Sequence, residues 1–492
     1  MPSLNTGSPM DGSEGSPKGR VTVYSVAGCP HCLRAKSRLG ELGLPVHEVD
    51  MNQHSELWVR VKELTGRSTV PQIFFNNVHV GGNDDLHRLS PEELERLVCL
   101  VRDEPVPPDG PPLPDEGHQE GAGNQYGEFK CERDEFADVV EEFKHCGVIG
   151  SHRKGLRVCR NCFTGVQLVD WLEREKGLDR SKAREMGKVL MDRKFINSVT
   201  GKREFEESSA LFRLLEHDPR SVLNAGEMAT CSPLPAAELS EILRNMILRL
   251  YSDHLSADGK TVDYTAMSQS PSFEHYCELA VQLQRVELRS LSREEKLAFF
   301  INIYNALVIH GNLRLGCPKN MWQRYRFFNY ISYLIGGEVF TLQDIENGVL
   351  RGNRKGVAQL LKPFSKSDPR LQVALPDAEP LIHFALNCGA KSCPPIKTYT
   401  AKDIDIQLLT AAEAFLENDD GCRVDPEKRE VKLSQIFKWY KADFGDTDEK
   451  LLSWILNHMS DSPKKSSLQT VLKTGSFKVS YMPYDWSSNS KD

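Results

Sequence analysis

Two cysteines separated by two residues form the first candidate site of this chain, at Cys29 and Cys32. They follow a β-branched, alternating stretch at 21–26 that predicts a strand, and they precede a stretch with helical spacing at 31–42. A cysteine at a helix N-terminus faces free N–H groups, and the helix dipole favours its thiolate over its thiol. A protonated His31 adds to that effect. The pattern therefore predicts a redox-active dithiol.

Zinc binding is the alternative for this pair, because Cys-x-x-Cys is also half of many zinc sites. A zinc site needs further ligands in the same domain, and Cys99 is the one other cysteine before a Pro-rich stretch that begins near residue 103. We therefore prefer redox chemistry to metal binding, and we expect no metal here.

The elements that must position the pair form a short alternating series. The order is strand, helix, strand, helix, strand, strand, helix within about 80 residues, which predicts a compact α/β domain. The strands are expected at 21–26, 47–51, 72–76 and 78–80, and the helices at 31–42, 55–65 and 90–101. Ser90, Pro91 and Glu93 supply an N-cap, a first-turn proline and a capping-box partner for the last helix.

Residues 20–102 resemble a glutaredoxin, because three motifs occur in the order of that family. These are Cys29-Pro30-His31-Cys32, Thr69-Val70-Pro71 and Gly81-Gly82-Asn83-Asp84-Asp85. The resemblance implies a thioredoxin-like fold, glutathione as co-substrate, Cys29 as nucleophile and Cys32 as resolving thiol. It also implies a cis peptide bond before Pro71. The positions that it assigns to glutathione binding are Thr69, Val70, Pro71, Gly82, Asp84 and Asp85.

The whole chain is too long for one small binding module, since 492 residues suggest about three domains. The net charge of -7 argues against a global nucleic-acid polycation. Thirteen scattered cysteines do not form a disulfide scaffold and indicate a reducing compartment. Residues 1–19 have no apolar signal segment, so we expect a disordered leader on a cytoplasmic protein. Residues 103–125 combine six prolines with no Lys or Arg, which predicts a stiff, extended linker.

Four basic residues gather in the middle of the chain: Arg153, Lys154, Arg157 and Arg160. They lie in a turn-rich stretch between two predicted helices, and the surrounding segment 144–169 has no acidic residue. One interpretation is a solvated loop. The other is attraction to an anionic membrane face, worth about 1 kcal/mol per basic residue near the surface. Nearby cysteines have irregular spacing and no suitable histidine, which disfavours a metal site: Cys131, Cys146, Cys159 and Cys162.

Residues 126–217 resemble a DEP domain. The resemblance rests on Gly147-Val148-Ile149, Phe163-Thr164-Gly165 and the segment Leu168-Val169-Asp170-Trp171-Leu172. It implies a small, winged-helix-like α+β module of three helices with a β-arm, which docks to a membrane or receptor. We expect its terminal hairpin to have strands at 204–207 and 210–214. Because the basic residues lie in a loop and not on a recognition helix, we expect no nucleic-acid partner.

A third polar cluster lies in the C-terminal region, at His383, Cys388 and Cys393. With the segment around Asn302 and Asn305 it resembles the domain of unknown function 547 family over roughly 240–486, and residues 232–487 are expected to form one larger α+β domain. A thiolate, an imidazole base and an orienting amide are the groups of a cysteine hydrolase or transferase. The alternative is that the cysteines and the histidine pack the core.

The leading hypothesis is a multidomain, glutathione-linked thiol–disulfide oxidoreductase. Its expected partners are glutathione and a protein disulfide or glutathionylated substrate. The middle module is expected to dock to an anionic membrane surface or a receptor. The expected localisation is therefore cytoplasmic, which allows a position peripheral to the plasma membrane. One rival is a signalling adaptor whose glutaredoxin fold only binds. The other is a cysteine hydrolase or transferase in the C-terminal domain.

Overall fold

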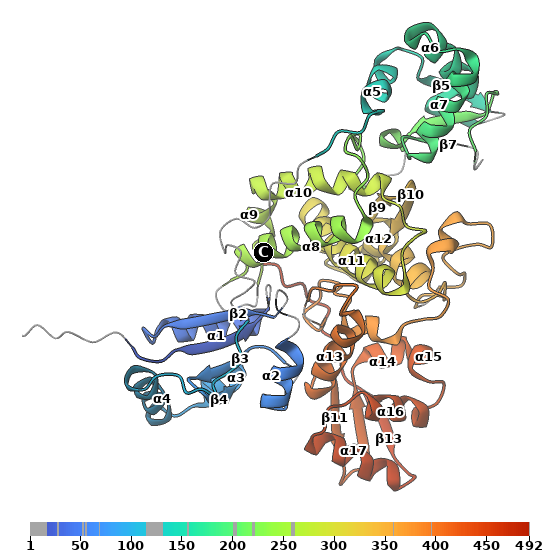
Figure 1. Ribbon diagram of the computed structural model, residues 1–492. Coiled ribbons are helices and arrows are strands. Elements are labelled where there is room, and N and C mark those ends of the chain that lie inside the picture. The colour runs from blue at the N-terminus through green and yellow to red at the C-terminus, as the bar shows by residue number, and fades with distance from the viewer. Residues whose placement is uncertain are drawn as a thin grey trace, which may run out of the picture. The chain divides into compact units, whose positions relative to one another are not determined.

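The computed structural model describes residues 17–26, 29–51, 54, 57–67, 69–114, 131–154, 157–199, 204–218, 222–256, 261–357, 359–394 and 396–491. The described residues up to 114 belong to one compact unit, and those from 131 onward belong to a second (Figure 1). The predicted leader and the second half of the predicted linker lie almost entirely outside the described residues. Within the described ranges, no helix is both long and apolar enough to cross a membrane.

The first unit is built around one four-stranded sheet. Its strands have the order β2-β1-β3-β4, with β1 and β2 parallel and the other pairs antiparallel. The elements are β1 (Val21–Ser25), α1 (Pro30–Gly40), β2 (Val46–Asp50), α2 (Leu57–Thr65), β3 (Gln72–Phe75), β4 (Val78–Gly81), α3 (Asn83–Arg88) and α4 (Pro91–Asp103). This is the predicted thioredoxin-like α/β fold, with one short helix, α3, that the periodicity did not indicate.

Burial explains why these segments take these forms. Strand β1 is buried along its whole length, as a central strand with covered faces should be. Helix α4 begins with the predicted capping box, in which Ser90 accepts from the Glu93 N–H and Glu93 accepts from the Ser90 N–H. The sheet therefore holds the end of β1, where Cys29 follows, in a fixed position.

Part of the predicted linker packs back onto the first unit. The Tyr24 hydroxyl donates to the Pro112 carbonyl, and Leu113 packs beside the cluster that contains Val26, Cys29 and Cys32. The described segment up to residue 114 is therefore an ordered covering of this unit and not an extended spacer. Burial of an apolar side chain such as Leu113 supplies the stabilisation that composition alone did not indicate.

The middle module contains three α-helices and a small sheet with the strand order β5-β6-β8-β7. Its elements are α5 (Ala137–His145), β5 (Gly150–Lys154), β6 (Arg157–Thr164), α6 (Gly165–Lys176), α7 (Arg180–Asp192), β7 (Ile196–Ser198), β8 (Leu211–Leu214) and the short 3₁₀ turn η2 (Leu215–His217). The three helices were predicted.

Two predictions for this module were wrong in detail. The basic stretch is not a loop, because β5 and β6 form an antiparallel hairpin. The terminal pairing joins β8 to β7, and residues 204–207 are not a strand. None of the described side chains at 150–153 and 158–161 of the β5–β6 hairpin is buried, so this part lacks the apolar alternation from which a strand is predicted.

The two ends of the middle module are joined to each other. Cys131 and Cys231 form a disulfide, and next to it the Asp134 N–H donates to the Thr230 carbonyl at 2.8 Å. Asp134 also accepts from Arg285 at 2.5 Å, and both of these side chains are buried. We expected no disulfide scaffold from the scattered cysteines, and the structure has one disulfide among the described residues. Its reason is long-range packing that brings positions 100 residues apart together.

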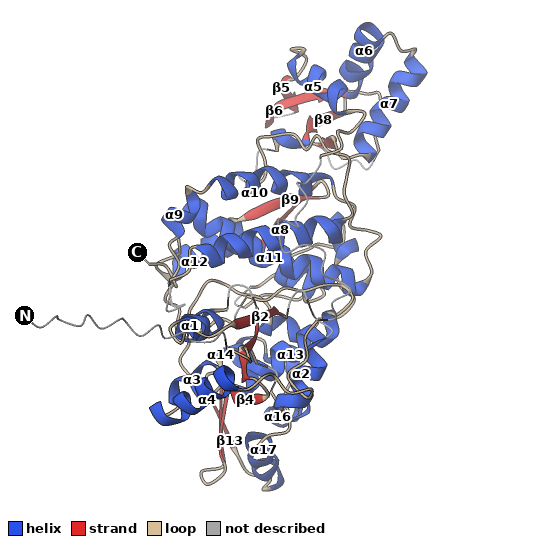
Figure 2. Ribbon diagram, turned by 60° about the vertical axis from the view of Figure 1, so that its left-hand side comes forward, coloured by secondary structure: helices blue, strands red, loops and turns tan. Residues whose placement is uncertain are grey.

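The C-terminal domain has two apolar cores. The first surrounds the buried helix α11, and the second lies among α13 to α17 and the sheet β11-β12-β13 (Figures 1 and 2). The helices and strands are α8 (Ala236–Asp253), α9 (Tyr264–Ser268), α10 (Pro271–Val281), α11 (Arg293–Leu315), α12 (Met321–Tyr330), β9 (Ser332–Ile335), β10 (Glu338–Thr341), α13 (Ile404–Glu417), β11 (Cys422–Asp425), β12 (Glu430–Leu433), α14 (Gln435–Trp439), α15 (Lys441–Phe444), α16 (Asp448–Asn457), α17 (Pro463–Lys473) and β13 (Lys478–Tyr481).

Four short helical segments that are 3₁₀ or π rather than α complete the described part of this domain. They are η3 (Gln282–Arg285), η4 (Asp344–Leu350), η5 (Pro369–Val373) and η6 (Pro380–Phe384). The element η4 is a π-helix, a form that is frequent at functional sites. His383 lies in the 3₁₀ turn η6.

Candidate functional site

Cys29 occupies the N-cap of α1. Its sulfur accepts a hydrogen bond from the Cys32 N–H at 3.3 Å, because the helix begins at Pro30 and leaves the first-turn N–H groups pointing at the cap. The same sulfur lies 3.9 Å from the Val70 carbonyl oxygen, and the Val70–Pro71 bond is cis. The fold therefore brings three predicted site residues together around one sulfur.

The two cysteines have different surroundings. Burial, and then the contact with Cys29, raise the pKa of Cys32 well above its usual value, so Cys32 holds its proton at neutral pH. The helix N-terminus favours negative charge at Cys29. This difference suits a first sulfur that attacks and a second that stays protonated until it is needed.

His31 does not strengthen the thiolate in the way that was expected. Burial by neighbouring groups, and then the Arg34 guanidinium, lower the pKa of His31 below its usual value. Arg34 Nη2 lies 3.0 Å from His31 Nδ1, and because a guanidinium only donates, this nitrogen accepts and the ring is neutral. The helix terminus, and not a protonated histidine, supplies the positive field.

The predicted glutathione positions lie near β3 and β4, on the side of the sheet opposite to β2. There the loop that carries Val70 meets the start of α3. A Cβ on Gly82 would lie 3.6 Å from the Pro71 carbonyl oxygen, which shows how closely the two segments approach. Gln72 Nε2 donates to the Thr69 carbonyl at 2.8 Å and fixes the loop before Val70.

Asp84 and Asp85 have different roles at the start of α3. Asp85 accepts from the Gly82 N–H at 2.9 Å and forms an ion pair with Arg67. Burial opposes ionisation of Asp85, but these two contacts outweigh it and lower its pKa. Asp84 is exposed and accepts from the Asn83 side-chain amide at 3.0 Å. Arg67, which the sequence did not single out, thus engages Asp85 and leaves Asp84 facing solvent.

The basic residues of the middle module lie on the β5–β6 hairpin. Arg153 and Arg160 are exposed, and Val158, which pairs with Arg153 across the hairpin, is 55% exposed. Lys154 and Arg157 pair through their backbones at the end of the hairpin, and their side chains lie outside the described parts. The arrangement combines exposed positive charge with an exposed apolar side chain.

His383 has a carboxylate as its partner. Its Nε2 lies 2.8 Å from Asp443 Oδ2, and its ring stacks on Tyr440 at a centroid distance of 3.9 Å. Arg351 donates to both oxygens of Asp443, at 2.5 Å and 2.9 Å. Burial lowers the pKa of His383, so the ring is neutral beside an ionised Asp443.

Cys388 and Cys393 have each other as partners. Their sulfurs lie 2.8 Å apart, and the Tyr484 hydroxyl lies 3.3 Å from Cys393 Sγ and 3.8 Å from Cys388 Sγ. Among the contacts described for this region, none joins either sulfur to His383. The predicted cysteine–histidine pairing stays a prediction, and the geometry gives a dithiol.

Asn302 and Asn305 hold the backbone around this cluster. Asn302 donates to the Tyr399 carbonyl at 2.8 Å. Asn305 donates to the Ala385 carbonyl at 3.0 Å and accepts from the Asn387 N–H at 2.8 Å. Each amide thus satisfies buried backbone groups of a loop, which is a positioning role.

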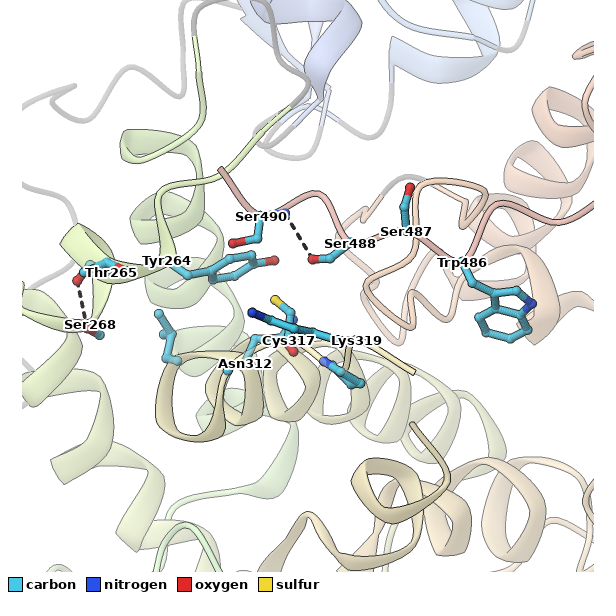
Figure 3. Close-up of a pocket in the computed structure, with 13 residues that line it drawn as sticks. Tyr264, Thr265, Ser268, Asn312, Cys317, Lys319, Trp486, Ser487, Ser488 and Ser490 are labelled. Atoms are coloured by element: carbon cyan, nitrogen blue, oxygen red, sulfur yellow. Dashed lines mark hydrogen bonds between the residues drawn. The ribbon is translucent and has the colours of Figure 1, made fainter. Parts of the chain in front are cut away.

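A cavity of about 600 Å³ lies at the C-terminal end of α11, away from the predicted residues. Figure 3 shows Tyr264, Cys317 and Lys319 on one part of its wall, and Trp486 farther along. Burial raises the pKa of Cys317, so this thiol is not activated. In the described residues, no group of three or more His, Cys, Asp or Glu side chains has a metal-binding arrangement.

Three family models match the chain in the predicted order. The glutaredoxin model matches residues 21–80. The model of the domain found in Dishevelled, Egl-10 and Pleckstrin (DEP) matches residues 148–214. The model of the protein of unknown function DUF547 matches residues 288–416. The three-part architecture is thereby confirmed.

Several known proteins are similar to the first domain. Glutaredoxin from Pseudomonas aeruginosa is 42% identical over 81 residues, which are 16% of this chain and 94% of that protein. Glutaredoxin 1 from Rickettsia prowazekii is 38% identical over 81 residues, which are 16% of this chain and 85% of that protein. The solution structure of glutaredoxin from Brucella melitensis is 42% identical and covers 18% of this chain and 92% of its own, with a TM-score of 0.16. Through its first domain this chain belongs to the glutaredoxin family, and DEP and DUF547 regions follow that domain.

Proposed function

We propose that the protein is a glutathione-linked thiol–disulfide oxidoreductase that its middle module docks to an anionic membrane surface. The observation that carries the redox activity is Cys29 at the N-cap of α1, with its sulfur facing the Cys32 N–H and the loop of Val70. The membership of the glutaredoxin family supports the same chemistry.

The reaction begins with attack of the Cys29 thiolate on the glutathione sulfur of a glutathionylated protein. The substrate's S–S bond breaks, its thiolate leaves and takes a proton, and Cys29 carries glutathione as a mixed disulfide. A second glutathione attacks that disulfide, releases oxidised glutathione and regenerates Cys29. For a protein disulfide, Cys32 instead attacks the mixed disulfide between Cys29 and the substrate and closes the Cys29–Cys32 disulfide.

Asp84 is the carboxylate that we assign to the ammonium of glutathione. It is exposed at the start of α3, and its negative charge opposes that of Arg34 in setting the pKa of His31, the residue between Pro30 and Cys32. Asp85, by contrast, is already held by Arg67 and the Gly82 N–H.

Asp84→Asn should raise the KM for glutathione and leave kcat nearly unchanged. An exposed ion pair contributes about 0.2–1 kcal/mol, so the KM rises by up to roughly fivefold. Steady-state kinetics at low ionic strength measure the effect, and Asp103→Asn, at an exposed position at the end of α4, is the matched control. An unchanged KM removes Asp84 from the glutathione site.

Membrane docking rests on the exposed β5–β6 hairpin. An amphipathic element with basic residues around an apolar side chain suits the boundary between anionic headgroups and acyl chains. Arg153, Val158 and Arg160 supply those groups on one hairpin.

Arg153→Glu with Arg160→Glu should weaken binding of the full chain to vesicles of phosphatidylserine and phosphatidylcholine. Losing two attractions of about 1 kcal/mol each lowers affinity roughly 30-fold, and added salt lowers the wild-type affinity as well. Lys182→Glu with Lys188→Glu on α7 changes the net charge equally and should bind like the wild type. Vesicle sedimentation that shows the same loss for both double variants contradicts a docking role for the hairpin.

The oxidoreductase and the non-catalytic adaptor make opposite predictions for the first domain. If the protein is an oxidoreductase, the full chain should reduce a glutathionylated peptide with glutathione, glutathione reductase and NADPH as the electron supply. Activity no greater than the uncatalysed rate would favour the adaptor. The hydrolase alternative needs an imidazole beside a thiolate, and the described contacts of His383 favour Asp443 as its partner.

A further inference from the structure

The sulfur of Cys393 faces three groups that can donate a hydrogen bond. The Cys388 N–H donates to it at 3.2 Å, and the Tyr484 hydroxyl and the Cys388 thiol, each of which can donate or accept, lie 3.3 Å and 2.8 Å away. A neutral thiol is a weak acceptor, whereas a thiolate is a strong one. All three groups can donate to a thiolate at Cys393, so the arrangement suits a thiolate at this sulfur.

The two sulfurs are close enough to bond after a small movement. Their separation of 2.8 Å exceeds the length of an S–S bond by about 0.8 Å. Gly389 has a φ of +81°, a left-handed conformation that lets the chain reverse between the two cysteines. Both cysteine residues are half-buried and keep part of their surface exposed, which attack on a small disulfide requires.

The loop that carries the cysteines is fixed from both sides. Asn305 on α11 holds its first residues, and the Asn387 side chain donates to the Pro394 carbonyl at 2.7 Å. On the other side the segment around Tyr484 runs along the loop, since the Asp485 N–H donates to Ser392 Oγ at 2.8 Å. Trp439 and Trp486 pack against the Tyr484 ring at 4.9 Å and 4.6 Å.

We propose that Cys388 and Cys393 form a second redox centre, distinct from Cys29 and Cys32, that exchanges electrons with glutathione disulfide. The Cys393 thiolate attacks one sulfur of glutathione disulfide, which breaks that S–S bond and releases one glutathione. Cys388 then loses its proton and attacks the Cys393 sulfur, which releases the second glutathione and forms the Cys388–Cys393 disulfide. Two protein thiols are oxidised and one glutathione disulfide is reduced to two glutathiones.

The protonation states agree with this assignment of roles. Burial opposes ionisation, but the donors from Cys388 and Tyr484 outweigh it and lower the pKa of Cys393 to about 7. The contact with Cys393 and burial raise the pKa of Cys388, which keeps this thiol protonated until the first step is complete. The pair thus has one attacking and one resolving sulfur.

The test uses the full chain with Cys29→Ser and Cys32→Ser, so that no electrons come from the first domain. The protein is equilibrated at a series of glutathione to glutathione disulfide ratios, quenched in acid, alkylated and digested with trypsin. Lys391 lies between the two cysteines, so an oxidised pair appears in mass spectrometry as two peptides joined by a disulfide. We expect the amount of this disulfide-linked species to rise with the fraction of glutathione disulfide. Addition of glutathione should reduce it back to the two free thiols.

Single variants then assign the order of attack. Cys388→Ser should accumulate a glutathione adduct on Cys393, because the resolving thiol is absent. Cys393→Ser should form the corresponding adduct on Cys388 at least about tenfold more slowly at pH 7, because burial, which remains in this variant, still raises the pKa of the Cys388 thiol. Thiols that stay free at the highest glutathione disulfide fraction, or adducts on both wild-type cysteines without a linked peptide, overturn the proposal.

Tyr484→Phe separates activation of Cys393 from simple packing. The substitution removes one donor and retains the ring between Trp439 and Trp486. We expect the pH of half-maximal alkylation of Cys393 to rise by about one unit. Tyr481→Phe, on β13, is the matched control and should leave that pH unchanged. An unchanged alkylation profile in Tyr484→Phe contradicts the proposed thiolate site.

Discussion

Replacing Cys29 by serine should abolish reduction of a glutathionylated peptide by the full chain, whereas Cys32→Ser should retain turnover. The Cys29 sulfur forms the new bond, and a serine hydroxyl at that position is a far weaker nucleophile. We expect a fall of at least about 100-fold for Cys29→Ser, to the uncatalysed rate. Cys32 donates its N–H to Cys29, and serine keeps that backbone group.

The measurement is coupled glutathione oxidation at fixed substrate. Cys99→Ser is the matched control, because Cys99 is an exposed thiol on α4 of the same domain, and its activity should equal that of the wild type. With a protein disulfide as substrate, both Cys29→Ser and Cys32→Ser should be inactive, because closing the dithiol needs two sulfurs. Activity in Cys29→Ser together with its loss in Cys32→Ser on the glutathionylated peptide would show that the two roles are reversed.

Asp443→Asn should destabilise the C-terminal domain by about 3–5 kcal/mol, because it leaves the buried Arg351 guanidinium without its anion. The Asp443 side chain is fully buried and accepts from Arg351, Arg354 and His383. The amide can accept one or two of these hydrogen bonds but cannot balance the charge.

Hydrogen exchange of residues 441–457 in the full chain, followed across a urea series, reports the free energy of unfolding of this domain alone. Asp446→Asn is the matched control, since Asp446 is exposed and pairs only with Lys450 among its described contacts, and its change should stay within about 0.5 kcal/mol. Equal stability of Asp443→Asn and the wild type would mean that the ion pair does not support the fold.

The same variant has a pH signature. Hydrogen bonds from His383 and Arg351, together with the positive charge of Arg351, hold the pKa of Asp443 below its unfolded value, although burial opposes ionisation. The stabilisation is therefore complete above about pH 4, the unfolded pKa, and is lost as the pH falls toward the lower folded pKa. The difference in stability between wild type and Asp443→Asn should narrow over that acidic range.

Much of the first domain followed from local patterns. The Cys29 cap, the Ser90 capping box and the alternation of β1 depend on residues within one or two helical turns, so one sequence contains their physics. Helix α3 escaped prediction because it has six residues and follows a glycine pair that indicates a turn. The β5–β6 hairpin was not predicted because none of its described side chains at 150–153 and 158–161 is buried.

The sequence by itself determined the order of three modules, the Cys-x-x-Cys pair at the start of the first helix and the types of residue at the C-terminal cluster. Only the tertiary structure decided which of those residues meet. Tyr484 reaches Cys393 across 91 positions, Asp443 reaches His383 across 60, and Arg285 reaches Asp134 across 151. Contacts between residues so far apart in the sequence depend on the packing of whole elements and on the need to pair buried charges. Local sequence periodicity predicts neither of these.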